Sequence, residues 1–233
     1  DPISLRSFYD GNFFGLLNPI GVMSGLLSVC MVVFHGATYL NRRTEGDVRK
    51  TAKKLVFSVG IVFLILLTVA GSLIVFYTRG YTLLSVGPSP ELNILHNDVV
   101  RSAGGWFQSY FIYPWKFFGP ALAYAGIFMA LFATYFNWRN FAFWGSAFAI
   151  GGCIATAGFT LFPFIMPSST NPAESLTIWN AVSSQYALNT MLYVGVVLLL
   201  IILGYKIFAY HSIWGQKPTL SEEDVEKNKH TFY

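Results

Sequence analysis

Long apolar runs dominate the chain. A membrane-spanning helix needs about 20 mostly apolar residues, and five segments of this sequence meet that requirement. They cover residues 19–40, 55–77, 117–136, 141–166 and 187–210, and none has Asp, Glu or Arg in its interior. The pattern predicts an all-α fold: a polytopic membrane bundle of five transmembrane helices, with residues 1–233 forming a single membrane domain.

Composition supports the membrane interpretation. Of the 233 residues, 54% are hydrophobic and 11% are charged, whereas soluble domains carry about 25% charged residues. A soluble fold of this composition would expose large apolar patches. We therefore expect an integral membrane protein.

Lysine and arginine predict its orientation. Five spans place the loop 41–54, the turn 137–140 and the tail 211–233 on one side, and the loops 78–116 and 167–186 on the other. The first side, with Lys206 at the membrane interface, carries eleven basic residues: Arg42, Arg43, Arg49, Lys50, Lys53, Lys54, Arg139, Lys206, Lys217, Lys227 and Lys229. The other side carries four: Arg6, Arg79, Arg101 and Lys116. Cytoplasmic loops are enriched in Lys and Arg, so we expect a cytoplasmic C-terminus. Topology thus explains the net charge of +4, and no nucleic-acid partner is expected.

The connections between spans carry their own signals. The outer stretch 106–118 is rich in aromatic residues, as expected at the headgroup level, while the outer loop 78–105 is long and polar. The short turn 137–140 predicts an antiparallel hairpin of the third and fourth spans. In FPFIMPSST (162–170), Pro163 and Pro167 are expected to end the fourth span at the outer surface. The tail from Ser221 reads as a short exposed helix.

Candidate chemistry within the spans is sparse. His35 is the one histidine in a span, and a haem with two protein ligands needs a second axial group, such as a methionine from a facing helix. Among the methionines, Met129 matches the membrane depth of His35 least poorly. The favoured interpretation is nevertheless a hydrogen-bonded or interfacial histidine. Cys30 and Cys153 lack metal-ligand spacing and read as packing residues. No metal site and no catalytic residue is predicted, so the chain alone is not expected to be catalytic.

The densest polar cluster is the outer segment 167–190. Ser175 or Thr177 is expected to cap a short interfacial helix containing Trp179. One interpretation is a loop solvated by water and headgroups; the other is a surface that binds a partner subunit or a lipid-like substrate. The candidate residues for the second are Trp179, Ser183, Ser184 and Gln185.

Separately, Gly21 and Gly25 form a GxxxG pair, which favours a close helix–helix contact.

Four stretches resemble subunit II of the bacterial cytochrome bd quinol oxidase. They are GNFFGLLNPIGVMSGLLSV (11–29), HGATYL (35–40), TAGFTLFPFIMPSST (156–170) and SLTIWNAVSSQYALN (175–189). The positions that carry this signature, expected to be structural, are Asn18, Pro19, Pro163, Pro167, Ser168 and Ser169. One departure from the family pattern is Asn180, where the resemblance implies Asp.

The resemblance implies a non-haem subunit of a respiratory complex in the bacterial cytoplasmic (inner) membrane. Haems b and d are then expected in a partner subunit I, with ubiquinone or menaquinone as the substrate class and a small single-helix accessory subunit as a further partner. The family's subunit II has nine spans, so the chain is expected to correspond to its last five helices, with the N-terminal helices of the subunit as additional partners. The complex would oxidise quinol, reduce dioxygen to water and generate a proton-motive force. Two alternatives remain open: half of a small transporter or permease, and a purely structural assembly subunit.

Overall fold

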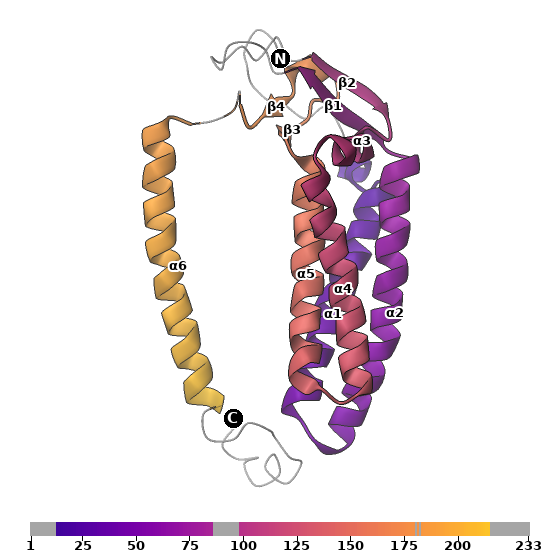
Figure 1. Cartoon of the computed structure of the whole chain (residues 1–233), viewed down its shortest axis with the longest axis vertical. Helices are drawn as coiled ribbons and strands as arrows, with labels where there is room; N and C mark the ends of the chain where they lie inside the picture. Colours follow the sequence, from indigo (N-terminus) through magenta and orange to yellow (C-terminus); the bar gives the residue numbers. More distant parts are fainter. Residues whose placement is uncertain (1–12, 86–97, 180, 182, 215–233) are drawn as a thin grey trace.

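Four long helices form the body of the protein in a computed structural model that describes residues 13–85, 98–179, 181 and 183–214. After a short 3-10 turn, η1 (Phe13–Leu16), come α1 (Pro19–Arg43), α2 (Gly46–Phe76), α4 (Phe118–Tyr135) and α5 (Arg139–Leu161). Figure 1 shows these helices side by side, with α6 (Gln185–Trp214) standing apart from them. The predicted class, a helical polytopic membrane protein with five long apolar helices, is confirmed.

The core of the bundle lies between α1, α2, α4 and α5. Phe34 of α1 packs edge-on against Phe63 of α2, with ring centroids 5.7 Å apart, and both are fully buried. Small residues of α4 and α5 complete the core, among them Ala123, Ala130 and Ala149. Most large apolar side chains outside this core are exposed, as expected for surfaces that face lipid.

Glycines let α4 and α5 approach closely. A Cβ atom on Gly126 would lie 2.8 Å from Ala149 Cα, and one on Gly152 would lie 2.6 Å from Ala123 Cα. Contacts of this kind depend on the absence of a side chain. By contrast, Gly25 of the GxxxG pair faces open space, so a helix contact there stays a prediction about a neighbour outside the described chain.

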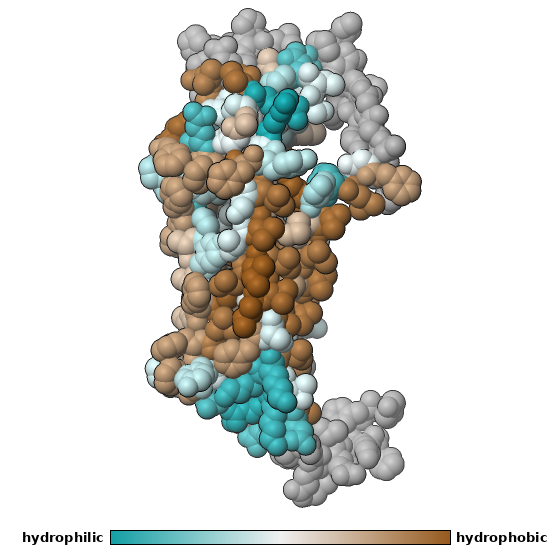
Figure 2. Space-filling model, turned by 90° about the vertical axis from the view of Figure 1, so that its right-hand side faces the viewer, coloured by the Kyte–Doolittle hydropathy of each residue, from teal (hydrophilic) through white to brown (hydrophobic). Residues whose placement is uncertain are grey.

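Two connections meet at one end of the bundle, which we call the basic end. It includes Arg49 and Lys53 of α2 and Asn137 of the α4–α5 turn. Arg49 Nη2 donates to Asn137 Oδ1 at 3.3 Å, and Lys53 Nζ donates to the same oxygen at 3.1 Å. Figure 2 shows a hydrophilic patch at this end, below a broad apolar surface. Arg49 and Lys53, two of the basic residues used in the topology argument, therefore lie together at this end, while Lys217, Lys227 and Lys229 lie outside the described residues.

Extended segments occupy the opposite end, the strand-bearing end, where the sequence predicted only loops and helix ends. An antiparallel pair joins β1 (Arg79–Ser85) to β2 (Asp98–Ala103), and α3 (Gly105–Ile112) and η2 (Pro114–Phe117) lead into α4. A second pair joins β3 (Phe164–Met166) to β4 (Leu176–Thr177), with η3 (Pro172–Glu174) between them.

The end of the fourth span differs from the expected limit at 166. Helix α5 ends at Leu161, and the Phe162–Pro163 peptide is cis. Proline has no N–H to continue the helix and disfavours helical backbone at the preceding residue. Residues 164–166 therefore pair as a strand instead of adding a helical turn.

Candidate functional site

The segment that follows α5 folds back on itself at the strand-bearing end. The Ile178 N–H donates to the Pro163 carbonyl at 3.0 Å, and the Ser168 N–H donates to Ser175 Oγ at 3.0 Å. Ser175 and Thr177 are buried. The expected short helix containing Trp179 is not seen in the described residues: Leu176–Thr177 forms β4, and a turn follows in which the Ala181 N–H donates to the Thr177 carbonyl at 3.1 Å.

The four candidate interface residues are divided between two elements. Trp179 follows β4 and is 37% exposed, with its ring 6.4 Å from the Phe162 ring. Ser184 Oγ accepts from the Ala187 N–H at 3.3 Å, and Gln185 Nε2 donates to Asn189 Oδ1 at 3.2 Å, so both belong to the start of α6. Ser183 is exposed. Within the described residues no hydrogen bond or ring contact joins Trp179 to the other three, and Asn180 lies outside them.

The signature positions make local structural contacts. Asn18 caps α1, because its Oδ1 accepts from the Gly21 N–H at 2.7 Å, and Pro19 occupies the first turn, where its missing N–H is not needed. Pro163 is buried, Pro167 is half-buried and Ser169 is exposed. Ser168 Oγ accepts from the Asn171 N–H at 3.3 Å.

Lys116 is the unexpected residue of this end. The sequence places it among the outer basic residues, yet its side chain is fully buried. Its ammonium donates to the Phe162 carbonyl at 2.7 Å and to Ser109 Oγ at 2.9 Å. The rings of Tyr113 and Phe162 lie 5.3 and 5.4 Å away. Hydrogen bonds and aromatic faces thus replace the counter-ion that a buried cation usually requires; among the described residues no carboxylate pairs with it.

A second contact fixes α3 onto α5. The Tyr110 hydroxyl lies 2.6 Å from Thr160 Oγ1. Burial raises the pKa of the Tyr110 phenol, and the hydrogen bond to Thr160 opposes that shift. Tyr110 is therefore a neutral anchor that, together with Lys116, ties the segment before α4 to the end of α5.

His35 lies between α1 and α5, towards the basic end. Its Nδ1 is 2.8 Å from Ser146 Oγ, and its ring packs 4.9 Å from the ring of Phe143. Thr38 Oγ1 lies 2.7 Å from the same Ser146 oxygen. The favoured interpretation of a hydrogen-bonded histidine is therefore confirmed.

These contacts do not make a haem site. Met129 lines a groove between α2 and α4, whereas His35 contacts α5, so the structure gives the two residues no common site. The described part of the chain also contains no group of three His, Cys, Asp or Glu residues placed to hold a metal ion. The contacts that the structure gives His35 are those of helix packing and anchoring.

The fold and these contacts define a polytopic helical membrane protein whose polar side chains anchor helix ends. The chain belongs to the cytochrome bd terminal oxidase subunit II family, whose family model matches residues 2–213.

Two relatives give the extent of the similarity. The Escherichia coli K12 protein named cytochrome bd-I ubiquinol oxidase subunit 2 is 37% identical over 230 residues, which cover 98% of this chain and 60% of the relative. The Haemophilus influenzae protein named probable cytochrome oxidase subunit 2 is 35% identical over 230 residues, covering 97% of this chain and 59% of the relative. The chain therefore spans about three fifths of the length of these relatives.

Proposed function

We propose that this chain forms part of the non-haem subunit of a quinol oxidase in the bacterial cytoplasmic membrane. The assembled complex oxidises ubiquinol or menaquinol, reduces dioxygen to water and generates a proton-motive force. Membership of the subunit II family over residues 2–213 is the observation that carries this proposal. The printed name of the E. coli relative, a ubiquinol oxidase subunit, supports the substrate class.

In this proposal haems b and d are held by a partner subunit I and supply the electron transfer to oxygen. The placement of His35 against α5 and of Met129 in a groove between α2 and α4 supports that division, because the two residues share no site. The chain contributes a rigid bundle, with the strand-bearing end on the outer side and the basic end in the cytoplasm.

Further helices are proposed as partners of α6. The apolar side chains of α6, such as Leu199 and Ile202, are exposed along its length, and the relatives are longer than this chain. Helices of the same subunit, subunit I and a small single-helix accessory subunit are the proposed neighbours, together with membrane lipid.

The segment 167–185 is proposed to contact a neighbouring helix or a quinone at the outer surface. Partial exposure of Trp179 and the exposed polar start of α6 at Ser183, Ser184 and Gln185 support this role. Trp179 supplies a ring, and Gln185 an amide at a helix end, which are groups suited to an interface.

Co-purification tests the proposal. A tagged chain is purified from native membranes, the accompanying proteins are identified, and a reduced-minus-oxidised spectrum is recorded. We expect a haem-bearing partner with b- and d-type bands. Purification of the chain without such a partner would contradict the proposal. In the same purification, Trp179→Ala with Gln185→Ala should lower the yield of the complex; unchanged yield and haem content would remove only the interface role.

A further inference from the structure

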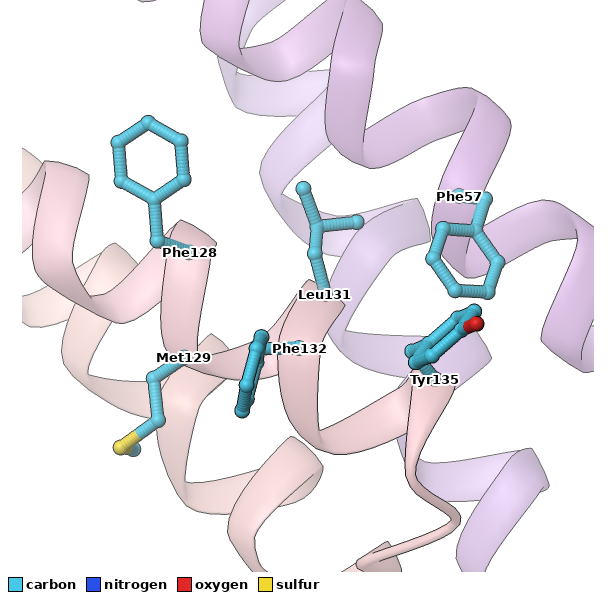
Figure 3. A pocket seen from close by; sticks show the side chains of 6 residues that line it. All are labelled: Phe57, Phe128, Met129, Leu131, Phe132 and Tyr135. Carbon is cyan, nitrogen blue, oxygen red and sulfur yellow. The ribbon is translucent and has the colours of Figure 1, made fainter.

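An apolar groove lies between α2 and α4 on the side of the bundle that leads to the basic end. Phe57 of α2 lines it together with Phe128, Met129, Leu131, Phe132 and Tyr135 of α4, and its volume is about 530 Å³. Figure 3 shows the lining side chains, with Phe57 on α2 and the other five on α4. The lining residues of α4 extend about 10 Å along the helix, which lies within the roughly 15 Å depth of one leaflet.

The α2 wall of the groove continues into basic residues. Arg49, Lys53 and Phe57 are spaced by four residues, so they form one line along the same face of α2. Each step advances about 6 Å along the helix. The α4 wall ends in the same place, because Asn137 follows Tyr135 closely and accepts hydrogen bonds from both Arg49 and Lys53.

Among the residues that the structure describes, these two cations have no carboxylate partner. Their shared acceptor, Asn137 Oδ1, is uncharged and belongs to a residue with a φ of 60° in the α4–α5 turn. In the part of the chain that the structure describes, neither Arg49 nor Lys53 makes an ion pair, whereas the neighbouring Lys50 pairs with Asp47 at 2.8 Å. Arg49 and Lys53 are half-buried, so an anion that reached them would be partly shielded from water.

We propose that the groove and its basic end bind an anionic phospholipid. The lipid phosphodiester contacts Arg49 and Lys53, and one acyl chain lies against Phe57, Phe132 and Tyr135. A free phosphate would use only the cations, and an uncharged isoprenoid tail would use only the groove. An anionic phospholipid has both parts at the required separation. Basic pockets between transmembrane helices are suited to such headgroups.

The test is a lipid titration of the delipidated complex, measured by native mass spectrometry. We expect long-chain phosphatidylglycerol to bind more tightly than phosphatidylcholine of the same chain length. The double substitution Arg49→Gln with Lys53→Gln should weaken phosphatidylglycerol binding roughly 10- to 30-fold. The matched control, Lys50→Gln with Lys54→Gln, removes the same charge from the same helix turns and should retain most of the binding.

Three results would overturn the proposal. Equal weakening by both double substitutions would mean that only general surface charge attracts the lipid. Equal binding of the two long-chain lipids would remove the role of the cations. Competition by inorganic phosphate or by short-chain phosphatidylglycerol as effective as that of the long-chain lipid would remove the role of the groove. The comparisons of lipids and of phosphate use the unsubstituted complex, so they hold even if a variant fails to assemble.

Discussion

Lys116 holds a positive charge in an apolar setting, and its surroundings explain how it is tolerated. Its ammonium bonds the carbonyl of Phe162, the residue before Pro163, and the hydroxyl of Ser109 in α3. The lysine therefore joins the segments that enter α4 and leave α5. Such an anchor stabilises the strand-bearing end more than a surface lysine would.

Truncation of this side chain should destabilise the protein. Lys116→Ala removes two hydrogen bonds from a charged donor and leaves a cavity, and we expect a loss of about 2–5 kcal/mol. Lys116→Met fills the space and abolishes the cost of burying a charge, so it should lower the free energy of unfolding by less than Lys116→Ala does. The thermal unfolding midpoint of the purified complex measures both changes. An unchanged midpoint for Lys116→Ala would show that the lysine is no anchor.

The burial of Lys116 was not predicted from the sequence, because a basic residue near a span end normally reaches water. A signal was present: Lys116 stands alone between Trp115 and Phe117, within a run of aromatic residues. His35 was easier to interpret. A single histidine whose best candidate second ligand, Met129, matches it poorly in depth favours a local hydrogen bond, and Ser146 provides one.

At the scale of elements, the contact of α4 with α5 is built from small residues. Gly119, Gly126, Gly145 and Gly152 all lie where an added Cβ would meet backbone of the facing helix. Since lipid gives little hydrophobic drive for helices to associate, close backbone packing is an important source of their attraction.

Adjacent glycines of α5 provide a matched test. Gly152→Ala would bring a Cβ within 2.6 Å of Ala123 Cα, so we expect α4 and α5 to separate at a cost of about 1–3 kcal/mol. Gly151→Ala points into open space and should be neutral or slightly stabilising. The yield and unfolding midpoint of the detergent-solubilised protein report the difference. Equal behaviour of the two variants would contradict this account of the helix contact.

Helix positions were predicted well and helix ends less well. Apolar length alone defines a span, so the five helices follow from composition along the chain. The pairing of β3 with β4 requires the chain to fold back after Pro163, and no local pattern in residues 164–177 specifies that these two strands pair. The small residues of α4 and α5 were visible in the sequence, but only the fold identifies which of them face each other.

For the molecule as a whole, the basic residues and the topology agree. The first turns of α2 and the α4–α5 turn meet through Asn137, although they are distant in the sequence. One end of the bundle therefore concentrates positive charge, and the other carries the strands and the anchors of Lys116 and Tyr110. This asymmetry supports the proposed cytoplasmic placement of the basic end.

The proposed function rests on family membership over residues 2–213. Within the described residues His35 is hydrogen-bonded to Ser146 and packs against Phe143. The central claim is that this chain is required by a quinol oxidase whose haems lie elsewhere.

Quinol-driven oxygen uptake by native membranes tests that claim most directly. Deletion of the gene should abolish the uptake catalysed by this oxidase together with the haem d band, and expression of the His35→Ala variant should restore both, as the unaltered chain does. The account would be contradicted if the oxygen uptake and the haem d band persisted after the deletion. It would also be contradicted if both returned with the unaltered chain but not with His35→Ala.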